Sequence, residues 1–521
     1  MLTRLRVSGF KNLLDLDLHF GPFTCVAGVN GAGKSNLFDA VGFLAALADR
    51  PLVDAAASVR AEGRRATDVE SLFLRAGADS VAEMSFAAEM IVPGEAVDDL
   101  GQTARPSITF LLYHLVLARR QDASSSHLGP LEIVKEELSH INLGDAYRHL
   151  PFPHRAATWR RSAVTGSRRA PYFISTEREG GNRIVTLHQD GGGARHWSVP
   201  AQSLPRTVLS AANAAESPTA LAARREMQSW RLLRLEPSSL REPDDFRAPT
   251  RLGGDGAHLA ATLHYLATAA RPMDAGVAAG AASPAPTPAP EQLYGALAAR
   301  LSEIGAIGES GESGESGETA AIGELDGLGS ELGEVRVEAD AKRELLTVMA
   351  TGRDGVAHAA RSLSDGALRV LALAVLAVDP RAAGLLCLEE PENGIHPARI
   401  PAVLRLLQAI PTDVDEAVGS GNPLRQVIVN THSPAVVSGV PDASLLVAEP
   451  QEASLAGQRA RTVAFRALPG TWRAPRQQGI AAVTRAEILG PLHLEQRPPA
   501  GERHRRTARR EDPQPLLPYS T

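Results

Sequence analysis

The sequence predicts an α/β fold with a mixed parallel and antiparallel sheet, interrupted by an α-helical lobe and flexible linkers. An apolar strand pattern over 23–27 leads into a glycine-rich loop and then into a helical pattern that starts at Lys34. Two later apolar runs, 385–388 and 426–431, each deliver charged or polar residues at their carboxyl ends. Distant parts of the chain are therefore expected to contribute to one α/β unit.

Charge and cysteine content limit the class of protein. The 54 basic and 60 acidic residues give a net charge of −6, which excludes a uniformly basic protein that coats nucleic acid. Cys25 and Cys387 both lie in apolar runs, so the chain has no disulfide framework and fits a reducing cytoplasm. The longest apolar run, 370–378, is less than half the roughly 20 residues of a membrane span. We expect a soluble cytoplasmic protein without a signal peptide and with no membrane contact.

The N-terminal lobe, residues 1–210, is expected to consist mainly of strands. Alternation of polar and apolar residues predicts strands at 2–7, 14–20 and 23–27, within 80–120, and at 131–140. Hairpin signals at Gly180-Gly181-Asn182 and after Asp190 predict a β-meander within 171–200.

The rest of the chain divides by composition. Residues 211–339 are rich in alanine and leucine at helical spacing, which predicts an α-helical insertion. Two breaks in it, near 274–290 and 306–334, are expected to be flexible linkers, because they lack the apolar residues to bury a core. Residues 340–474 return to an α/β pattern, and the Arg- and Pro-rich tail 475–521 is expected to be mostly disordered.

The loop GVNGAGKSN matches the pattern G-x-x-x-x-G-K-[ST], with the required strand before it and helix after it. Its glycines let backbone N–H groups surround phosphate oxygens, and the following helix points its positive end at the same charge. Lys34 adds a charge for the β- and γ-phosphates, and Ser35 offers its hydroxyl to Mg²⁺. The alternative is a glycine-rich turn that binds nothing, and strand, helix, lysine and serine together argue against it. The expected nucleotide-binding residues are Gly28, Asn30, Gly31, Ala32, Gly33, Lys34, Ser35 and Asn36.

The strand at 385–388 delivers two adjacent carboxylates, Glu389 and Glu390, before Pro391 ends the strand. We expect Glu389 to orient Mg²⁺ through water and Glu390 to position and polarise an attacking water. By itself such a pair is more often a solvated strand end, but the phosphate loop reverses that preference.

Two further patterns place a helix N-terminus and a histidine near polar strand ends. Ser364 is an expected N-cap, followed by Asp365, Gly366 and an apolar helix, so this N-terminus suits an anion or is ordinarily capped. The strand pattern 426–431 delivers His432, and a lone histidine in such a place is more often structural than catalytic.

The segments LSDGALR, LEEPENGIHP and NTHSP, in this order behind the phosphate loop, resemble the ABC-like ATPase heads of the SMC, RecF and OLD group. They look most similar to stand-alone AAA-type ATPases related to OLD (overcoming-lysogenization-defect) proteins. The resemblance covers residues 1–50 and 335–445 and implies a P-loop NTPase fold of the ABC type that binds and hydrolyses ATP. It makes 28–35 the Walker A loop, Glu389 the Walker B acid and Glu390 the catalytic glutamate.

The same resemblance assigns roles to the remaining motifs. His432 matches the switch histidine that senses the γ-phosphate, and 393–396 falls where such heads carry the D-loop. The Walker B acid is usually aspartate, so the longer Glu389 is a departure. Gln102 and Gln121 are candidates for the Q-loop glutamine by sequence order alone. The signature motif would consist of Ser364, Asp365 and Gly366.

The resemblance also implies a homodimer in which two ATP molecules are sandwiched between two protomers. Ser364 of one protomer would face the γ-phosphate bound to the other, so that ATP joins the protomers and hydrolysis releases them.

The target of such a switch is open between two hypotheses. One is a DNA-associated motor or sensor in genome maintenance or phage defence; the other is an ATP-gated protein–protein module without DNA contact. No Asp-x-Asp pair of a Toprim nuclease follows Pro434, and Asp413-Val-Asp415 is expected to be an ordinary loop, so any nuclease would be a separately encoded effector. A transporter ATPase subunit is disfavoured by the long insertion.

Two basic segments are candidates for contact with duplex DNA. Residues 154–169 hold five arginines around Trp159, and 503–510 carry a second arginine cluster; a solvated basic face is the alternative for both. An aromatic content of 4% argues against a stacking platform for single strands.

Overall fold

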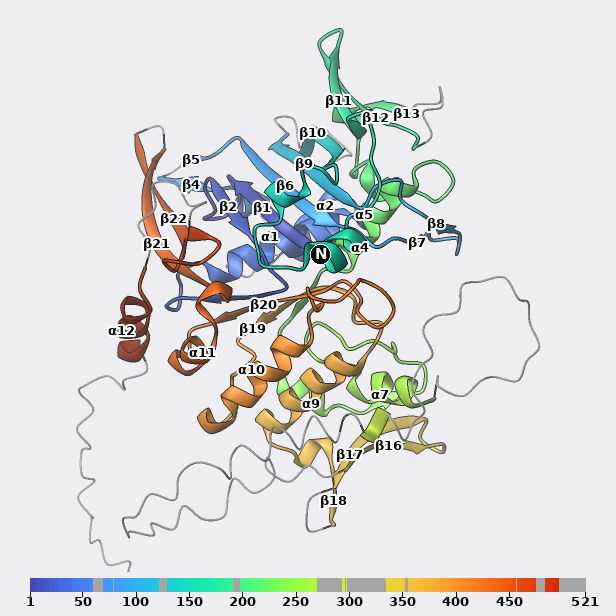
Figure 1. The fold of residues 1–521 in the computed structure, drawn as a ribbon, viewed down its shortest axis with the longest axis vertical. Helices are drawn as coiled ribbons and strands as arrows, with labels where there is room; N and C mark the ends of the chain where they lie inside the picture. The colour runs from blue at the N-terminus through green and yellow to red at the C-terminus, as the bar shows by residue number, and fades with distance from the viewer. Residues whose placement is uncertain are drawn as a thin grey trace, which may run out of the picture.

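The structure is a computed structural model in which the central sheet lies between a β-rich lobe and a helical lobe (Figure 1). The linkers expected near 274–290 and 306–334 lie outside the described residues, apart from residue 334, and so do Gln121 and the arginine cluster of the tail. The described residues are 1–59, 69–77, 79–120, 129–190, 197–268, 293–295, 297, 334–351, 355–455, 457–474 and 483–495.

A six-stranded sheet forms the centre of the molecule. Its strands are β3 (Phe23–Ala27), β14 (Arg231–Leu233), β19 (Gly384–Glu389), β20 (Arg425–Thr431), β21 (Leu445–Leu455) and β22 (Gln458–Ala467). Their order is β14-β19-β20-β3-β21-β22, and only the β21–β22 pairing is antiparallel. The mixed sheet predicted from the sequence is therefore present, and β3 has the predicted bounds.

An eight-stranded antiparallel sheet forms the N-terminal lobe, in the order β13-β12-β11-β10-β9-β6-β1-β2. Its strands are β1 (Leu2–Ser8), β2 (Leu16–His19), β6 (Glu83–Ile91), β9 (Phe110–Arg119), β10 (Leu131–His140), β11 (Tyr172–Glu179), β12 (Asn182–Leu187) and β13 (Trp197–Pro200). The predicted turn at Gly180-Gly181 joins β11 to β12, and β10 has its predicted bounds. The β-rich character of this lobe was thus visible in the sequence.

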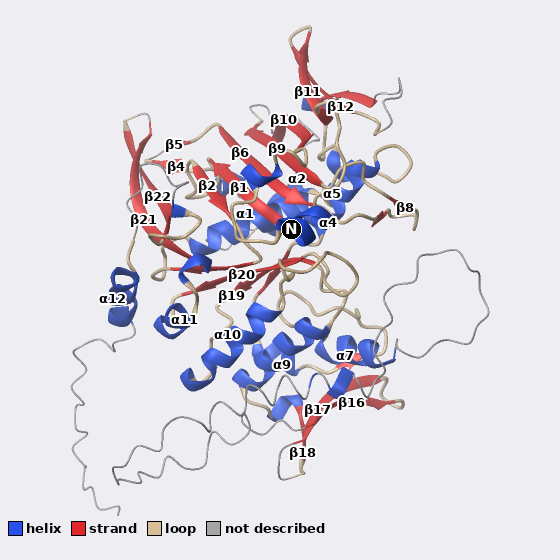
Figure 2. Cartoon of the chain, viewed as in Figure 1, coloured by secondary structure: helices blue, strands red, loops and turns tan. Residues whose placement is uncertain are grey.

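Smaller sheets lie at the periphery (Figure 2). The strands of the helical lobe are β15 (Asp244–Asp245), β16 (Glu334–Asp340), β17 (Leu345–Thr351) and β18 (Ala357–Ala359). Two short hairpins consist of β4 (Arg75–Ala76) with β5 (Asp79–Ser80), and β7 (Ala96–Val97) with β8 (Thr103–Ala104).

Helices pack against both the central sheet and the antiparallel sheet. They are α1 (Lys34–Leu47), α2 (Leu52–Ser58), α3 (Ala146–His149), α4 (Arg161–Ala163), α5 (Pro218–Gln228), α6 (Pro237–Arg241), α7 (Leu259–Thr268), α9 (Asp365–Val378), α10 (Ile400–Ala409), α11 (Pro434–Gly439) and α12 (Arg485–Glu495). Of the helices in the described part of the chain, none is both long and apolar enough to cross a membrane.

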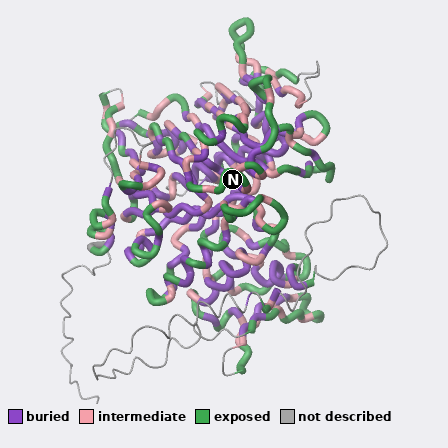
Figure 3. Tube along the Cα trace, in the orientation of Figure 1, coloured by how far each residue is buried: buried purple, intermediate pink, exposed green. Residues whose placement is uncertain are grey.

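The central sheet is buried on both faces, as its near-continuous apolar strands require (Figure 3). Along β19, Leu385 and Cys387 belong to the core shared with α1 and the antiparallel sheet. Leu386 and Leu388 belong to the core shared with α9 and α10. Successive side chains of a strand point to opposite faces, so one short strand joins the two cores and fixes the lobes around it.

Two segments differ from the sequence prediction. The range 211–339, expected to be a helical insertion, also contributes β14, which pairs in parallel with β19 at the edge of the central sheet. Three residues are too few for a strand period to show, so the sequence carried no signal for it. Residues 485–495 of the expected disordered tail form α12, which is anchored because Arg485 donates to the carbonyl oxygens of Val437 and Val440 at 2.6 and 2.7 Å.

A buried carboxyl group on β10 joins the antiparallel sheet to the segment that precedes α5. Glu136 is fully buried and accepts hydrogen bonds from the backbone N–H groups of Val208 and Leu209, both at 2.8 Å. The Tyr113 hydroxyl donates to it at 3.2 Å. Burial raises the pKa of Glu136 to about 7, although these donors lower it.

We predict that replacing Glu136 by Gln changes how stability depends on pH. Folded protein holds a proton on Glu136 between the ordinary value of 4.5 and about 7, and unfolding releases it. This group therefore makes the free energy of unfolding fall as pH rises through that window, by up to ~1.4 kcal/mol per unit. Denaturant unfolding from pH 5 to 8 should show this slope in wild type minus variant; a flat or rising difference contradicts the prediction.

Candidate active site

The phosphate loop, the two glutamates and His432 meet at the carboxyl ends of the parallel strands of the central sheet. Because β3, β20 and β19 are parallel and in register, Ala27 lies beside Thr431, and Asn430 lies beside Glu389. The residues that follow these strand ends leave the sheet at the same edge. The phosphate loop, the two glutamates and His432 are thereby brought together from positions some four hundred residues apart in the sequence.

The phosphate loop is closed by its own lysine. Lys34 is only 6% exposed, and its Nζ donates to the carbonyl oxygens of Gly28 and Val29 at 2.5 and 2.9 Å. A phosphate group would compete for these same donors. Helix α1 begins at Lys34, so its positive N-terminal end faces the interior of the loop.

Asn12, which no sequence pattern had indicated, braces the phosphate loop. Its side-chain oxygen accepts a hydrogen bond from Nδ2 of Asn36 at 2.8 Å. Gly33 adopts φ 96°, and a Cβ there would overlap the Asn12 amide. The glycine is therefore required by both conformation and space.

Glu390 is the most constrained residue of the site. Its φ of 45° is unusual for a residue with a side chain, and its N–H donates to the backbone and side-chain oxygens of Asn430 at 3.1 and 3.0 Å. Nδ1 of His432 lies 2.8 Å from Oε1, and Nδ2 of Asn393 donates to Oε2 at 2.7 Å. His432 and Asn393 thus hold the carboxylate, and Asn430 holds the backbone of Glu390. The family resemblance had indicated His432 and, within 393–396, Asn393, but not Asn430.

Ser35 and both glutamates line one polar cavity of about 250 Å³. Its other lining residues are Leu233, Arg234, Leu235, Glu236, Arg369, Leu388, Pro391, Asn393 and Asn430. The Ser35 hydroxyl and the Glu389 carboxylate are oxygen donors of the kind that Mg²⁺ prefers. Within the described ranges no group of three or more His, Cys, Asp or Glu could hold a metal ion. This donor set fits a magnesium ion whose remaining ligands are phosphate oxygens and water.

The signature segment is ordered within the chain but does not line this cavity. Ser364 caps α9 by accepting from the N–H of Ala367 at 3.2 Å, as predicted. Arg241, at the end of α6, donates to Asp365 at 2.5 Å and to the carbonyl oxygen of Leu363 at 3.1 Å. The segment is therefore held by the helix that follows β14.

Arg369 of α9 joins two loops of the site and was not predicted. Its Nε donates to the carbonyl oxygen of Leu235 at 3.0 Å, and its Nη1 donates to that of Asn393. Arg234 and Glu236 form an ion pair of 3.1 Å just beyond β14. Arg234 and Glu236 directly follow β14, which shows no strand pattern in the sequence. The sequence therefore did not indicate that these two residues would lie beside the glutamates.

Gln102 does not reach this site. It lies exposed in the turn between β7 and β8, a hairpin that contacts α5, and its N–H donates to Asp98 at 2.9 Å. The segment after β14, which lines the cavity with Leu235 and Glu236, occupies the place beside Glu389 instead. The choice of Gln102 by sequence order was therefore wrong, because this residue lies in the β7–β8 hairpin of the N-terminal lobe and not beside the glutamates.

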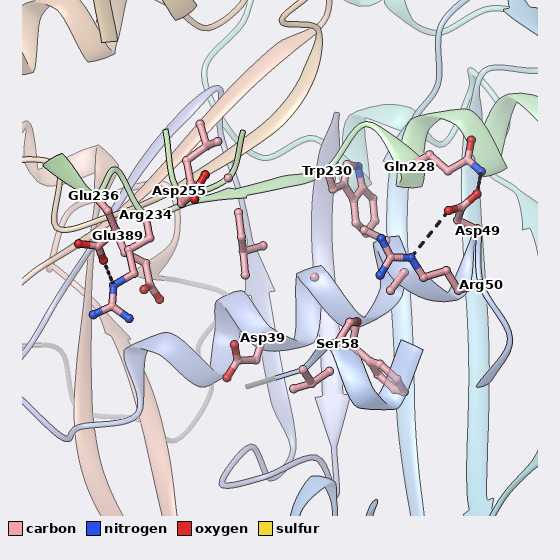
Figure 4. A pocket seen from close by; sticks show the side chains of 18 of the residues that line it. Asp39, Asp49, Arg50, Ser58, Gln228, Trp230, Arg234, Glu236, Asp255 and Glu389 are labelled. Carbon is pink, nitrogen blue, oxygen red and sulfur yellow. Dashed lines mark hydrogen bonds and ion pairs between the residues drawn. The ribbon is translucent and has the colours of Figure 1, made fainter. Parts of the chain in front are cut away.

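A larger groove of about 740 Å³ runs along α1 and shares Glu389, Arg234 and Glu236 with the polar cavity. Figure 4 shows Asp39 and Ser58 on one side of it and Trp230 and Asp255 on the other. Its middle is apolar. The ion pair just beyond β14 therefore belongs to the lining of both spaces.

The basic segment 154–169 lacks an exposed aromatic ring. Trp159 is fully buried and packs against Phe152, with ring centroids 5.5 Å apart. Arg168 stacks on Phe173, whereas Arg155 and Arg161 are exposed. Trp159 is therefore not part of an exposed basic surface, because its apolar ring completes a small core.

Asp413-Val-Asp415 lies in the loop after α10, as predicted. Asp413 accepts a hydrogen bond from the N–H of Asp415 at 2.8 Å, which is the local turn geometry of a short polar side chain.

Comparison with protein families adds one partial match. Residues 291–438 match the family described as "AAA domain, putative AbiEii toxin, Type IV TA system". The match includes α9, both glutamates and His432, while the phosphate loop lies outside it. This part of the chain is similar to an AAA domain. A search of curated proteins gave no match.

Solved structures of SMC heads are among those that match the chain. An SMC head bound to the C-terminal winged-helix domain of ScpA is 12% identical, with a TM-score of 0.40 over 90% of this chain and 98% of that one. A Pyrococcus furiosus SMC head bound to the C-terminal domain of ScpA is 11% identical, with a TM-score of 0.37, over 89% and 96%. The SMC head domain from Thermotoga maritima is 10% identical, with a TM-score of 0.32, over 89% and 98%. The fold is defined by the sheet order and loop geometry of the chain itself.

We predict that Gly366→Ala destabilises the protein. A Cβ at Gly366 would lie 2.5 Å from the carbonyl oxygen of Gly394, so α9 must shift, at a cost of about 1–3 kcal/mol. In a helix without this contact, Gly→Ala raises the free energy of unfolding by up to ~1 kcal/mol. Denaturant unfolding measures the change in the free energy of unfolding, and we expect it to fall. A variant that is more stable than wild type contradicts the close contact.

Proposed function

We propose that the protein binds ATP with Mg²⁺ and hydrolyses it to ADP and phosphate, and that ATP joins two copies of the chain. The observation that carries this proposal is the aim of Glu390. It is held by Asn430, Asn393 and His432 at the strand edge where the phosphate loop opens. A carboxylate constrained in this way, beside a lysine-containing anion loop, suits the polarisation of a water molecule.

The residues of the chain divide the work of hydrolysis. Lys34 exchanges the loop carbonyl oxygens for phosphate oxygens, and the N-terminus of α1 adds its dipole to the same charge. Magnesium held by Ser35, Glu389 and phosphate oxygens would neutralise charge that develops on the phosphates. Glu390 orients the attacking water and accepts its proton, while His432 fixes the carboxylate from the neighbouring strand.

The geometry of the signature segment supports an ATP sandwich. Ser364 and Gly366 lie outside the lining of the polar cavity in their own chain, although α9 presents a capped N-terminus. Facing a second copy, this N-terminus would gain charge-assisted hydrogen bonds only while the γ-phosphate is present. Such a contact distinguishes ATP from ADP, which is what a switch requires.

We further propose that the switch acts with duplex DNA, in genome maintenance or phage defence, as a stand-alone relative of OLD ATPases. Any nuclease would be a separate polypeptide. The exposed Arg155 and Arg161 support a local phosphate contact on a chain of net negative charge.

One observation favours a second candidate, an ATP-gated protein–protein module without DNA contact. The loop that carries Asp413 and Asp415 lies directly against the basic segment: the N–H of Arg155 donates to Val414, and Thr158 donates to the Asp415 carbonyl oxygen. Carboxylates beside the arginines weaken the local positive potential.

We predict that Glu390→Gln accumulates an ATP-bound dimer, because water is no longer polarised while every contact to ATP remains. Ser364→Arg should stay monomeric and inactive, since its side chain fills the space of the opposing γ-phosphate. Size-exclusion chromatography with light scattering, with and without ATP, measures both. Lys34→Ala serves as the control that loses ATP binding. If both variants behave as wild type, the sandwich is wrong.

We predict that duplex DNA stimulates the ATPase and that stimulation falls steeply with salt, because phosphate contacts release counterions. Arg155→Gln combined with Arg161→Gln should remove the stimulation. Arg178→Gln, an exposed arginine on β11, is the matched control and should retain it. ATPase rates that ignore DNA at every salt concentration favour the protein–protein module.

A further inference from the structure

One residue, through its hydroxyl and its backbone carbonyl, connects the three functional segments of the site. Thr431, the last residue of β20, is fully buried, and its Oγ1 donates to Oε1 of Glu392. The same oxygen accepts from the N–H of Ser433 at 2.9 Å. Its carbonyl oxygen accepts from the N–H of Gly28 at 3.3 Å. Thr431 therefore contacts the phosphate loop, the loop after the glutamates and the turn after His432.

Glu392 is an unusual group to bury at this point. It is 7% exposed, and its Oε2 is buried without a hydrogen-bond partner in the structure. Burial raises the pKa of the Glu392 carboxyl, and the nearby Glu390 carboxylate raises it further, while the Thr431 hydroxyl lowers it. An incompletely paired buried carboxyl costs stability, so its presence requires a compensating role.

The short backbone segment between Glu390 and Glu392 couples the position of one side chain to that of the other. Pro391 separates Glu390 from Glu392, and its ring fixes φ near −65°. Only a few backbone torsions therefore remain free between the anchored Glu392 side chain and the catalytic carboxylate. On the other strand, the Ser433 N–H held by Thr431 leaves His432 in a short turn between two fixed points.

We propose that Thr431 and Glu392 are positioning residues that hold Glu390 and His432 in the geometry required for hydrolysis. The inference rests on the proposed ATPase function. Neither side chain lines the polar cavity or contacts the phosphate loop through its side chain. Their effect on the reaction is exerted through the two residues that they place.

The test removes both polar groups of the hydroxyl–carboxyl contact, so that neither is left buried without a partner. Thr431→Val alone strands the Glu392 carboxyl, so the main variant is Thr431→Val combined with Glu392→Met, which replaces both partners by apolar groups of similar shape. We expect kcat to fall at least ~10-fold while the Kd for ATP and the midpoint of thermal unfolding change little. The single variant Thr431→Ser, which keeps the hydroxyl, should have a kcat close to that of wild type.

A matched control separates positioning from general loss of a buried hydroxyl. Thr207 is also buried, and its hydroxyl donates to the carbonyl oxygen of Leu47 at 2.8 Å, outside the site. Thr207→Val should leave kcat within ~2-fold of wild type. Adding His432→Ala to the double variant should cost less than the product of the separate effects, because the two act through one contact.

Amide hydrogen exchange of the nucleotide-free protein gives a readout independent of ATPase activity. Peptides that span 389–396 and 431–433 should exchange faster in the double variant than in wild type. An inactive wild type contradicts the proposed function alone. Unchanged exchange, an unchanged kcat, or parallel losses of kcat, ATP affinity and thermal stability each overturn the positioning role.

Discussion

The in-register pairing of three parallel strands, β19, β20 and β3, determines where every functional group lies. β3 ends at Ala27, directly before the glycine loop, whereas β19 and β20 end on the polar residues Glu389 and Thr431. The hydrogen-bond ladder aligns these ends to within a residue, so Gly28, Glu390 and His432 emerge side by side. The side chains of Asn430 and Thr431, which take no part in the backbone hydrogen bonds of the sheet, then bind the loop that follows β19. In a buried setting such bonds gain strength from the low dielectric, and the loops inherit the rigidity of the sheet.

Features that depend on neighbouring residues in the sequence were predictable. A strand, a glycine loop and a helix carry three successive local signals, and β3 and α1 begin where the pattern placed them. The cap at Ser364 is local as well, since its partner N–H lies three residues away. The order of polar residues after β19 and β20 was also visible, because buried parallel strands are unbroken apolar runs. The α/β class and the mixed sheet followed from these signals.

Features that depend on tertiary contact were not predictable. Asn12, Arg369 and Glu392 gain their contacts from residues far away in the chain. Arg369 and Glu392 lie within the segments LSDGALR and LEEPENGIHP, but the pattern of those segments did not indicate these contacts. The three residues of β14 are too few to show a period. Trp159 lies among arginines in the sequence, but its burial is decided by the residues that pack on it. The docking of α12 depends on one arginine that meets the carbonyl oxygens of another helix end, which composition does not express.

Strand β3 has β20 and β21 as its two neighbours in the sheet, and both are encoded several hundred residues later. While the chain is being synthesised, the antiparallel sheet of the first lobe can pair, yet β3 must wait with both edges bare. Pairings at such separation close slowly, and an unpaired apolar strand is prone to join other chains. Production of this protein in cells therefore calls for protection of the emerging polypeptide, and a chain truncated before residue 425 is expected to aggregate rather than retain a partial fold.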